Sequence, residues 1–242
     1  MAPLVVAHRG NSSVAPENTL AAVGSAVALD PAPEFVEVDV HRTADHHLVV
    51  LHDKTLERTC DRSGRVAELD LSTVRLASAG YAERFGGRFT DERVPLLEEV
   101  LDAVADSGVG VMIEVKAADI GAEVAHLVTQ RDEADRHVIA SFRPDVIAEA
   151  KAAAPTIRTL YLAEEYGEIT LDALRQTDAD ILGLSHRAVT PSAVARARAS
   201  GLELWCWTVN DLALAAALQA WGVDAIITDR PADVMGLVRA AR

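Results

Sequence analysis

Short apolar runs alternate with longer, Ala-rich amphipathic stretches along almost the whole chain. The apolar runs occupy residues 4–7, 35–40, 109–115, 137–141, 157–162, 181–184, 202–209 and 223–228. The stretches with apolar side chains at the i, i+3, i+4 spacing of a helix include residues 19–29, 124–128, 144–153, 191–199 and 212–221. A last helix begins at Pro231, because proline suits the first helical turn. Nearly continuous apolar strands that alternate with helices are typical of a parallel sheet covered on its outer faces.

The number of these units indicates the fold class. Eight strand–helix units in 242 residues match a (β/α)8 barrel, or TIM barrel, which typically needs about 250 residues. An open doubly wound sheet is the alternative. The Gly-rich phosphate turn that usually follows the first strand of such a sheet is replaced here by His8-Arg9-Gly10-Asn11. The pattern therefore favours a single barrel domain over residues 1–242.

One unit departs from the pattern, after the second apolar run. Residues 48–51 form a short apolar run that we interpret as the returning arm of a hairpin. Residues 53–94 then show weak periodicity before a clear helix at 96–104. A stretch of this length without strong structure is either functional or disordered. We expect a small subdomain inserted after the second strand, at about 53–94, over the mouth of the barrel.

Composition and charge limit the partners. Apolar residues make up 50% and charged residues 25% of the chain, as in ordinary foldable proteins. The net charge of −14 argues against nucleic acid or an anionic membrane surface as a partner. Cys60 and Cys206 form no C-x-x-C pair, and no apolar run reaches the roughly 18 residues of a membrane span. With no signal-peptide pattern at the N-terminus, we expect a cytoplasmic monomer or small homo-oligomer that acts on a small molecule.

Three carboxylates are predicted to converge inside the barrel mouth. Glu37 and Asp39 lie two residues apart on the second strand, so their side chains point to the same face. Glu114 points inward from the next strand of the barrel. Grouped carboxylates repel one another and are costly to bury alone, and an oxygen-rich site of this kind suits a hard divalent cation. The scattered histidines do not have the spacing of a zinc site.

Histidines and cations at other strand ends point to phosphate chemistry. His8 and His52 each follow an extended segment, and imidazole transfers protons near neutral pH. Arg9 offers a forked cation for phosphate oxygens. Lys116 offers a point charge, although it could equally pair with one of the glutamates, Glu37 or Glu114. Together these residues predict a metal-dependent phosphoesterase of unspecified substrate.

An ordered set of motifs then resembles a known family, the glycerophosphodiester phosphodiesterases. The motifs are His8-Arg9-Gly10, Pro16-Glu17-Asn18-Thr19, Glu37-Val38-Asp39-Val40, Val49-Val50-Leu51-His52-Asp53, Arg58-Thr59, Glu114-Val115-Lys116, Trp207-Thr208-Val209-Asn210 and Thr228-Asp229-Arg230-Pro231. They cover nearly the whole chain. Residues 61–90 match less well, and we expect them to govern the alcohol side of specificity.

The resemblance implies hydrolysis of glycerophosphodiesters to glycerol 3-phosphate and an alcohol, with Mg²⁺ or Ca²⁺. By similarity, the metal ligands would be Glu37, Asp39 and Glu114, the general acid and base His8 and His52, the phosphate contacts Arg9 and Lys116, and a pocket-lining residue Trp207. The placement of the hairpin favours His52 as the acid. Residue identity leaves open whether water attacks directly or the glycerol 2-hydroxyl first forms a cyclic phosphate. The alternatives in other classes are a lyase-type barrel phospholipase and a non-catalytic glycerophosphodiester-binding protein.

Overall fold

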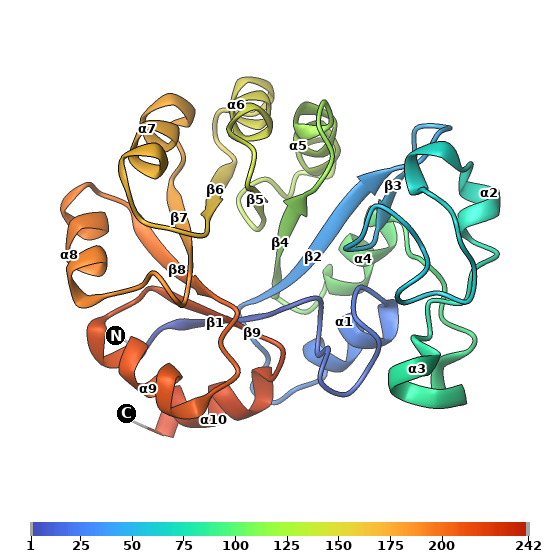
Figure 1. The fold of residues 1–242 in the computed structure, drawn as a ribbon, viewed down its shortest axis with the longest axis horizontal. Helices are drawn as coiled ribbons and strands as arrows, with labels where there is room; N and C mark the ends of the chain where they lie inside the picture. Colours follow the sequence, from blue (N-terminus) through green and yellow to red (C-terminus); the bar gives the residue numbers. More distant parts are fainter. Residues whose placement is uncertain (1, 241–242) are drawn as a thin grey trace.

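A computed structural model describes residues 2–240, which form a closed barrel of parallel strands surrounded by helices (Figure 1). In barrel order the strands are β1 (Leu4–Ala7), β2 (Phe35–Arg42), β4 (Gly110–Val115), β5 (Val138–Ser141), β6 (Arg158–Ala163), β7 (Ile181–Ser185), β8 (Glu203–Trp207) and β9 (Ala225–Thr228). Strand β1 pairs in parallel with both β2 and β9, and this closes the ring. The predicted TIM barrel is therefore confirmed, and the open sheet is excluded.

The outer helices follow the strands in the order that the periodicity predicts. They are α1 (Leu20–Val27), α4 (Leu97–Val104), α5 (Gly121–Gln130), α6 (Pro144–Ala153), α7 (Glu168–Thr177), α8 (Pro191–Ala199), α9 (Leu212–Trp221) and α10 (Pro231–Ala240). Polar caps fix several helix starts. The Thr19 side chain accepts a hydrogen bond from the backbone N–H of Ala22 at the start of α1, and Asp211 accepts one from Leu214 at the start of α9.

Side-chain alternation along the strands separates an outer core from the barrel interior. On β2, Val36, Val38 and Val40 pack under the helices, which leaves Glu37 and Asp39 facing inward. On β8, Cys206 packs in the outer layer, whereas Trp205 is buried in the interior, where the partly buried Trp207 packs against the same cluster. The interior cluster of Val6, Met112, Leu160, Trp205 and Ile227 fills the barrel below its mouth.

The insertion after the second strand forms a small unit with its own apolar cluster. Strand β3 (Leu48–Val50) pairs antiparallel with the end of β2, as the predicted hairpin requires. Short elements follow: η1 (Val66–Glu68), α2 (Leu71–Val74), α3 (Ala82–Phe85) and η2 (Gly86–Phe89). The cluster includes Leu51, Leu56, Val66, Val74 and Val94. Figure 1 shows the segment of α2 and α3 beside the barrel, next to β2 and α4.

The helices of the barrel are short. Across residues 2–240, none is long and apolar enough to cross a membrane.

Candidate active site

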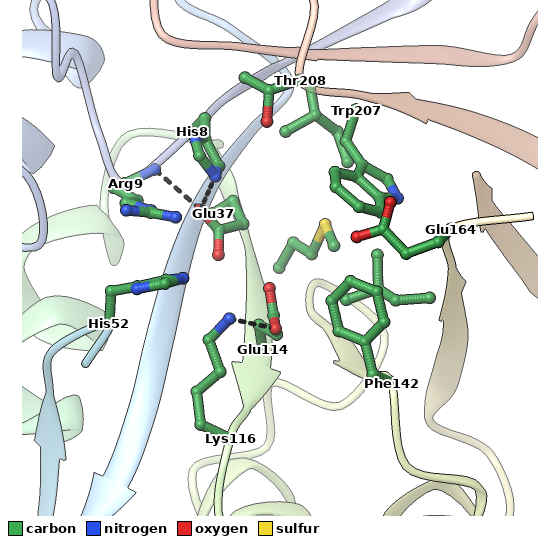
Figure 2. Close-up of a pocket in the computed structure, with 13 residues that line it drawn as sticks. His8, Arg9, Glu37, His52, Glu114, Lys116, Phe142, Glu164, Trp207 and Thr208 are labelled. Atoms are coloured by element: carbon green, nitrogen blue, oxygen red, sulfur yellow. Dashed lines mark hydrogen bonds and ion pairs between the residues drawn. The ribbon is translucent and has the colours of Figure 1, made fainter. Parts of the chain in front are cut away.

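A pocket of about 240 Å³ opens at the carboxyl ends of the barrel strands. Most of the side chains predicted for the site line it: His8, Arg9, Glu37, His52, Glu114, Lys116 and Trp207. Asp39 is fully buried, and it lies on β2 level with Glu114 on β4. Figure 2 shows Phe142, Glu164 and Trp207 on one side of the pocket, opposite a group made up of His8, Arg9, Glu37, His52, Glu114 and Lys116.

The three predicted carboxylates converge. Glu37, Asp39 and Glu114 each offer an oxygen, and these oxygens lie within 4.8 Å of one another. The register explains the convergence, because Asp39 on β2 pairs directly with Glu114 on β4. All three side chains are buried, with Glu114 the most exposed at 7%.

Two cations and an amide surround Asp39. The Nε of Arg9 lies 3.3 Å from Asp39 Oδ2, and the Nζ of Lys116 lies 3.0 Å from Oδ1. The side-chain amide of Asn18 donates to Oδ2 at 2.7 Å. Although burial opposes ionisation, these partners hold the pKa of Asp39 well below its usual value. Lys116 also forms an ion pair with Glu114, one of the two glutamates predicted as its partner. Among the described residues it forms none with Glu37, the other.

Glu37 is less well compensated. Its Oε2 accepts a hydrogen bond from the backbone N–H of Arg9 at 2.8 Å, whereas Oε1 is buried without a hydrogen-bond partner among the described residues. Burial, and then repulsion by Asp39 and Glu114, raise the pKa of Glu37 well above its usual value. Burial and Asp39 likewise raise the pKa of Glu114 to about 7. A bound cation would give the buried Glu37 oxygen a partner and would favour ionisation of Glu37 and Glu114. The three residues therefore fit a divalent metal.

The turn after β1 places both His8 and Arg9 at the mouth. Arg9 and Gly10 have positive φ angles of 57° and 81°. A Cβ at position 10 would lie 2.6 Å from the backbone of Ala22, so only glycine allows α1 to pack this close. The tight turn aims the Arg9 backbone N–H at Glu37 and leaves the guanidinium over the carboxylates.

Each site histidine is bound through Nδ1 to a carboxylate. His8 Nδ1 lies 2.6 Å from Asp229 Oδ1, and His52 Nδ1 lies 2.6 Å from Asp53 Oδ1. The other ring nitrogen of His8, Nε2, lies 3.9 Å from Glu37. Because Nδ1 is occupied, Nε2 is the nitrogen left to exchange protons in the pocket.

The two carboxylates differ in their other partners. Asp229 accepts hydrogen bonds from Asn210 Nδ2 at 2.6 Å and from Ser12 Oγ at 3.2 Å, both uncharged groups. Asp53 instead accepts a hydrogen bond from the charged Arg58, with Nε 2.6 Å from Oδ2. The negative charge beside His52 is therefore partly neutralised, whereas among the described residues Asp229 forms an ion pair with His8 alone.

The opposite wall is largely apolar. Phe142 and Trp207 meet edge to face, with ring centroids 5.4 Å apart, and Leu162 and Ile227 lie beside them. Glu164 at the end of β6 also lines the pocket, and the sequence carried no signal for it. Asp229 lies at a strand end within one of the recognised motifs, yet only the structure connects it with His8, 221 positions away in the chain.

Fold and site together define a TIM-barrel enzyme whose catalytic pocket is built for a small phosphate ester. The model of the glycerophosphoryl diester phosphodiesterase family matches residues 8–233. The chain therefore belongs to this family, and it is a phosphoric diester hydrolase.

Similar proteins agree over nearly the full length. The glycerophosphodiester phosphodiesterase of Caldanaerobacter subterraneus subsp. tengcongensis is 34% identical over 246 residues, covering 99% of each chain. That of Bacillus subtilis (strain 168) is 30% identical over 248 residues, covering 94% of this chain and 84% of the relative. A solved structure, an Oleispira antarctica phosphodiesterase in complex with the product sn-glycerol-3-phosphate, matches with a TM-score of 0.88 at 27% identity, over 98% of this chain and 97% of that one.

Proposed function

We propose that this enzyme hydrolyses glycerophosphodiesters to glycerol 3-phosphate and an alcohol by acid–base catalysis at a metal centre. Glu37, Asp39 and Glu114 would hold the metal, Mg²⁺ or Ca²⁺, since hard cations prefer carboxylate oxygens. The observation that carries the proposal is the position of two carboxylate-bound imidazoles, His8 and His52, at one pocket with these three buried carboxylates. The similarity to an enzyme that binds sn-glycerol-3-phosphate as its product supports the substrate class.

Arg9 and Lys116 would hold the phosphate. Both line the pocket beside the carboxylates, and Arg9 offers a planar fork that matches two phosphate oxygens. When bound, the metal supplies positive charge to the phosphate oxygens and offsets the charge that develops on them during the reaction. Trp207 and Phe142 would contact carbon atoms of the substrate on the opposite wall.

His8 would act as the base and His52 as the acid. His8 Nε2 takes the proton of the attacking hydroxyl, and the uncompensated charge of Asp229 stabilises the imidazolium that forms. His52 gives a proton to the oxygen of the departing alcohol. Its partner Asp53 is shared with Arg58, so the imidazolium of His52 is stabilised less and releases its proton more readily.

The pocket supports a water-soluble substrate. Its volume of about 240 Å³ lies below the roughly 300–1,000 Å³ that drug-sized ligands occupy. A glycerophosphodiester headgroup has fewer atoms than such ligands, whereas acyl chains would have to extend outside. This favours glycerophosphodiesters over the membrane lipids of a lyase-type phospholipase. Residues 53–94, within the single domain 1–242, follow His52 directly and would lie on the alcohol side, outside the side chains that line the pocket.

The test is release of glycerol 3-phosphate from glycerophosphocholine by the purified protein. We expect exhaustive chelation to abolish turnover and Mg²⁺ or Ca²⁺ to restore it. His8→Ala and His52→Ala should each lower kcat by about 10²–10⁴-fold, and the double variant should lose much less than the product of the two. Full activity after chelation would refute the metal centre, and near-normal turnover of either histidine variant would refute the acid–base pair. A binding protein would take up the substrate without releasing product.

A further inference from the structure

Two charged residues of the recognised motifs bind each other: Glu17, which has no role in this proposed function, and Arg58, whose only role there is to share Asp53 with His52. Glu17 belongs to the Pro16-Glu17-Asn18-Thr19 motif and Arg58 to the motif that follows His52. The guanidinium of Arg58 meets the carboxylate of Glu17 in a two-pronged ion pair, with Nη1–Oε2 at 2.9 Å and Nη2–Oε1 at 2.8 Å. They are 41 positions apart in the chain, so the pair joins the insertion to the loop that precedes α1.

Each partner also reaches one residue of the site. Glu17 Oε1 accepts a second hydrogen bond from Arg9 Nη1 at 2.7 Å. Arg58 Nε donates to Asp53 Oδ2 at 2.6 Å, and Asp53 Oδ1 holds His52 Nδ1 at 2.6 Å. An unbroken chain of charge-assisted hydrogen bonds therefore runs from Arg9 through Glu17, Arg58 and Asp53 to His52.

Charge complementarity, and the burial of Glu17, stabilise this series of hydrogen bonds. The Glu17 side chain is only 9% exposed, and it accepts three hydrogen bonds from two arginines. Burial alone would favour its neutral form, but Arg58 and Arg9 lower its pKa, so the carboxylate is ionised. The Arg58 guanidinium serves two carboxylates at once and lies 5.8 Å from the ring centroid of Tyr81 in the insertion. Lysine cannot replace it, since an ammonium has no planar fork to bind two carboxylates side by side.

We propose that Glu17 and Arg58 form a positioning bridge that sets the distance and orientation between Arg9, on the phosphate, and His52, at the leaving group. Neither bridge residue lines the pocket, so both would act through Arg9 and His52, which do. The inference rests on the roles proposed above for Arg9 and His52. A displacement of about 1 Å between a binding group and an acid is enough to cost roughly 10²-fold in rate.

The chain offers a matched control for the other explanation, that Arg58 merely anchors the insertion. Arg75, directly after α2, also makes a two-pronged ion pair with a glutamate of the barrel layer, Glu99 on α4. The side chains of Arg58 and Arg75 are both 36% exposed, yet within residues 2–240 the Arg75–Glu99 pair makes no hydrogen bond or ion pair to a residue of the site. Anchoring alone predicts equal effects of the two arginines, whereas positioning predicts a loss of catalysis at Arg58 only.

The experiment compares Arg58→Lys, Glu17→Gln and Arg75→Lys in the metal-loaded enzyme, with kcat, KM and Tm measured on glycerophosphocholine. A displacement of His52 relative to Arg9 of about 1 Å would cost roughly 10²-fold in rate. We expect kcat/KM to fall by about that factor in Arg58→Lys and Glu17→Gln, and by less than about threefold in Arg75→Lys, with similar Tm changes in Arg58→Lys and Arg75→Lys. The double variant at 17 and 58 should lose far less than the product of the single losses.

Two further readouts separate positioning from general destabilisation. Arg58→Ala should regain part of its turnover when guanidinium is added at concentrations too low to unfold the protein, and Arg75→Ala should not change. At constant pH, the ring ¹⁵N signals of His52 should shift in Arg58→Lys and stay in place in Arg75→Lys. Equal turnover of Arg58→Lys and Arg75→Lys would overturn the bridge, while normal turnover of His52→Ala would instead overturn the proposed acid–base pair.

Discussion

Replacing Asp229 by Asn tests which ring nitrogen of His8 must carry the proton for catalysis. In the native site Asp229 Oδ1 holds His8 Nδ1 at 2.6 Å, and Oδ2 accepts from Asn210 Nδ2 at 2.6 Å. Because Asn210 donates there, the new amide must turn its carbonyl oxygen to Asn210 and its NH2 group to His8. An NH2 group donates to Nδ1 and so places the ring proton on Nε2. The pocket side of His8 then has no lone pair with which to act as a base.

The size of the loss follows from two contributions. Loss of a charge-assisted hydrogen bond to the imidazolium costs about 1.5–3 kcal/mol, which is roughly 10–100-fold in rate. The wrong tautomer removes general-base assistance, worth about 10²–10⁴-fold. The corresponding change in the carboxylate–histidine pair of serine proteases lowers kcat by about 10⁴-fold. We therefore expect Asp229→Asn to lower kcat by at least about 10²-fold, with little change in KM.

The assay is glycerol 3-phosphate release at saturating metal, with Tm as a check on folding. Ser12→Ala is the matched control, because it removes only the neutral 3.2 Å hydrogen bond to the same carboxylate oxygen and the bond to the His8 carbonyl. It should cost less than about tenfold. A p-nitrophenyl phosphodiester, whose leaving group needs little protonation, should not rescue Asp229→Asn. A loss below tenfold at unchanged Tm, or rescue by this substrate, would refute His8 as the base.

Two predictions concern groups outside the site. Cys206 is fully buried in the outer core. Cys206→Ser should therefore lower the free energy of unfolding by about 1–3 kcal/mol in urea titrations and leave kcat unchanged. A large loss of turnover at equal stability would contradict this placement. Burial lowers the pKa of His137 from 6.5 to about 4. Above pH 6.5 His137 is neutral in both the folded and the unfolded protein. As the pH falls from 6.5 toward 4, only the unfolded protein binds the proton, so the free energy of unfolding falls by up to about 3 kcal/mol. His137→Gln should flatten this pH dependence in urea titrations.

The barrel and its carboxylate cluster could be predicted because both follow from local patterns. Strand alternation alone separates Val36 and Val38 from Glu37 and Asp39, and the meeting with Glu114 needs only that neighbouring strands end at the same edge. The interior of the insertion could not be predicted in this way. Its helices α2 and α3 have four residues each, too few to show a helical period, and its apolar cluster gathers residues from 49 to 94.

The partners of the proposed catalytic side chains could not be predicted from the sequence, for a different physical reason. A histidine at a strand end is visible in the sequence, but the carboxylate that orients it is selected by tertiary packing. Asp229 reaches His8 across the closing pair of strands, β1 and β9, and Glu17 reaches Arg58 across the insertion. Glu164 lies in none of the recognised motifs, so only the structure shows that it lines the pocket.

The charges at the mouth also explain how an acidic protein could bind an anion. The chain carries a net charge of −14, and its two pocket cations are already engaged, Arg9 with Asp39 and Lys116 with Asp39 and Glu114. When all three carboxylates are ionised, they exceed the two cations by one negative charge, and Glu37 Oε1 has no hydrogen-bond partner among the described residues. Burial and this mutual repulsion raise the pKa of Glu37 and Glu114. With all three carboxylates ionised and no metal bound, the pocket would repel a phosphodiester. A divalent cation reverses the local sign, and it would also free Lys116 from Glu114 to contact a phosphate oxygen, so metal binding and substrate binding should be positively coupled.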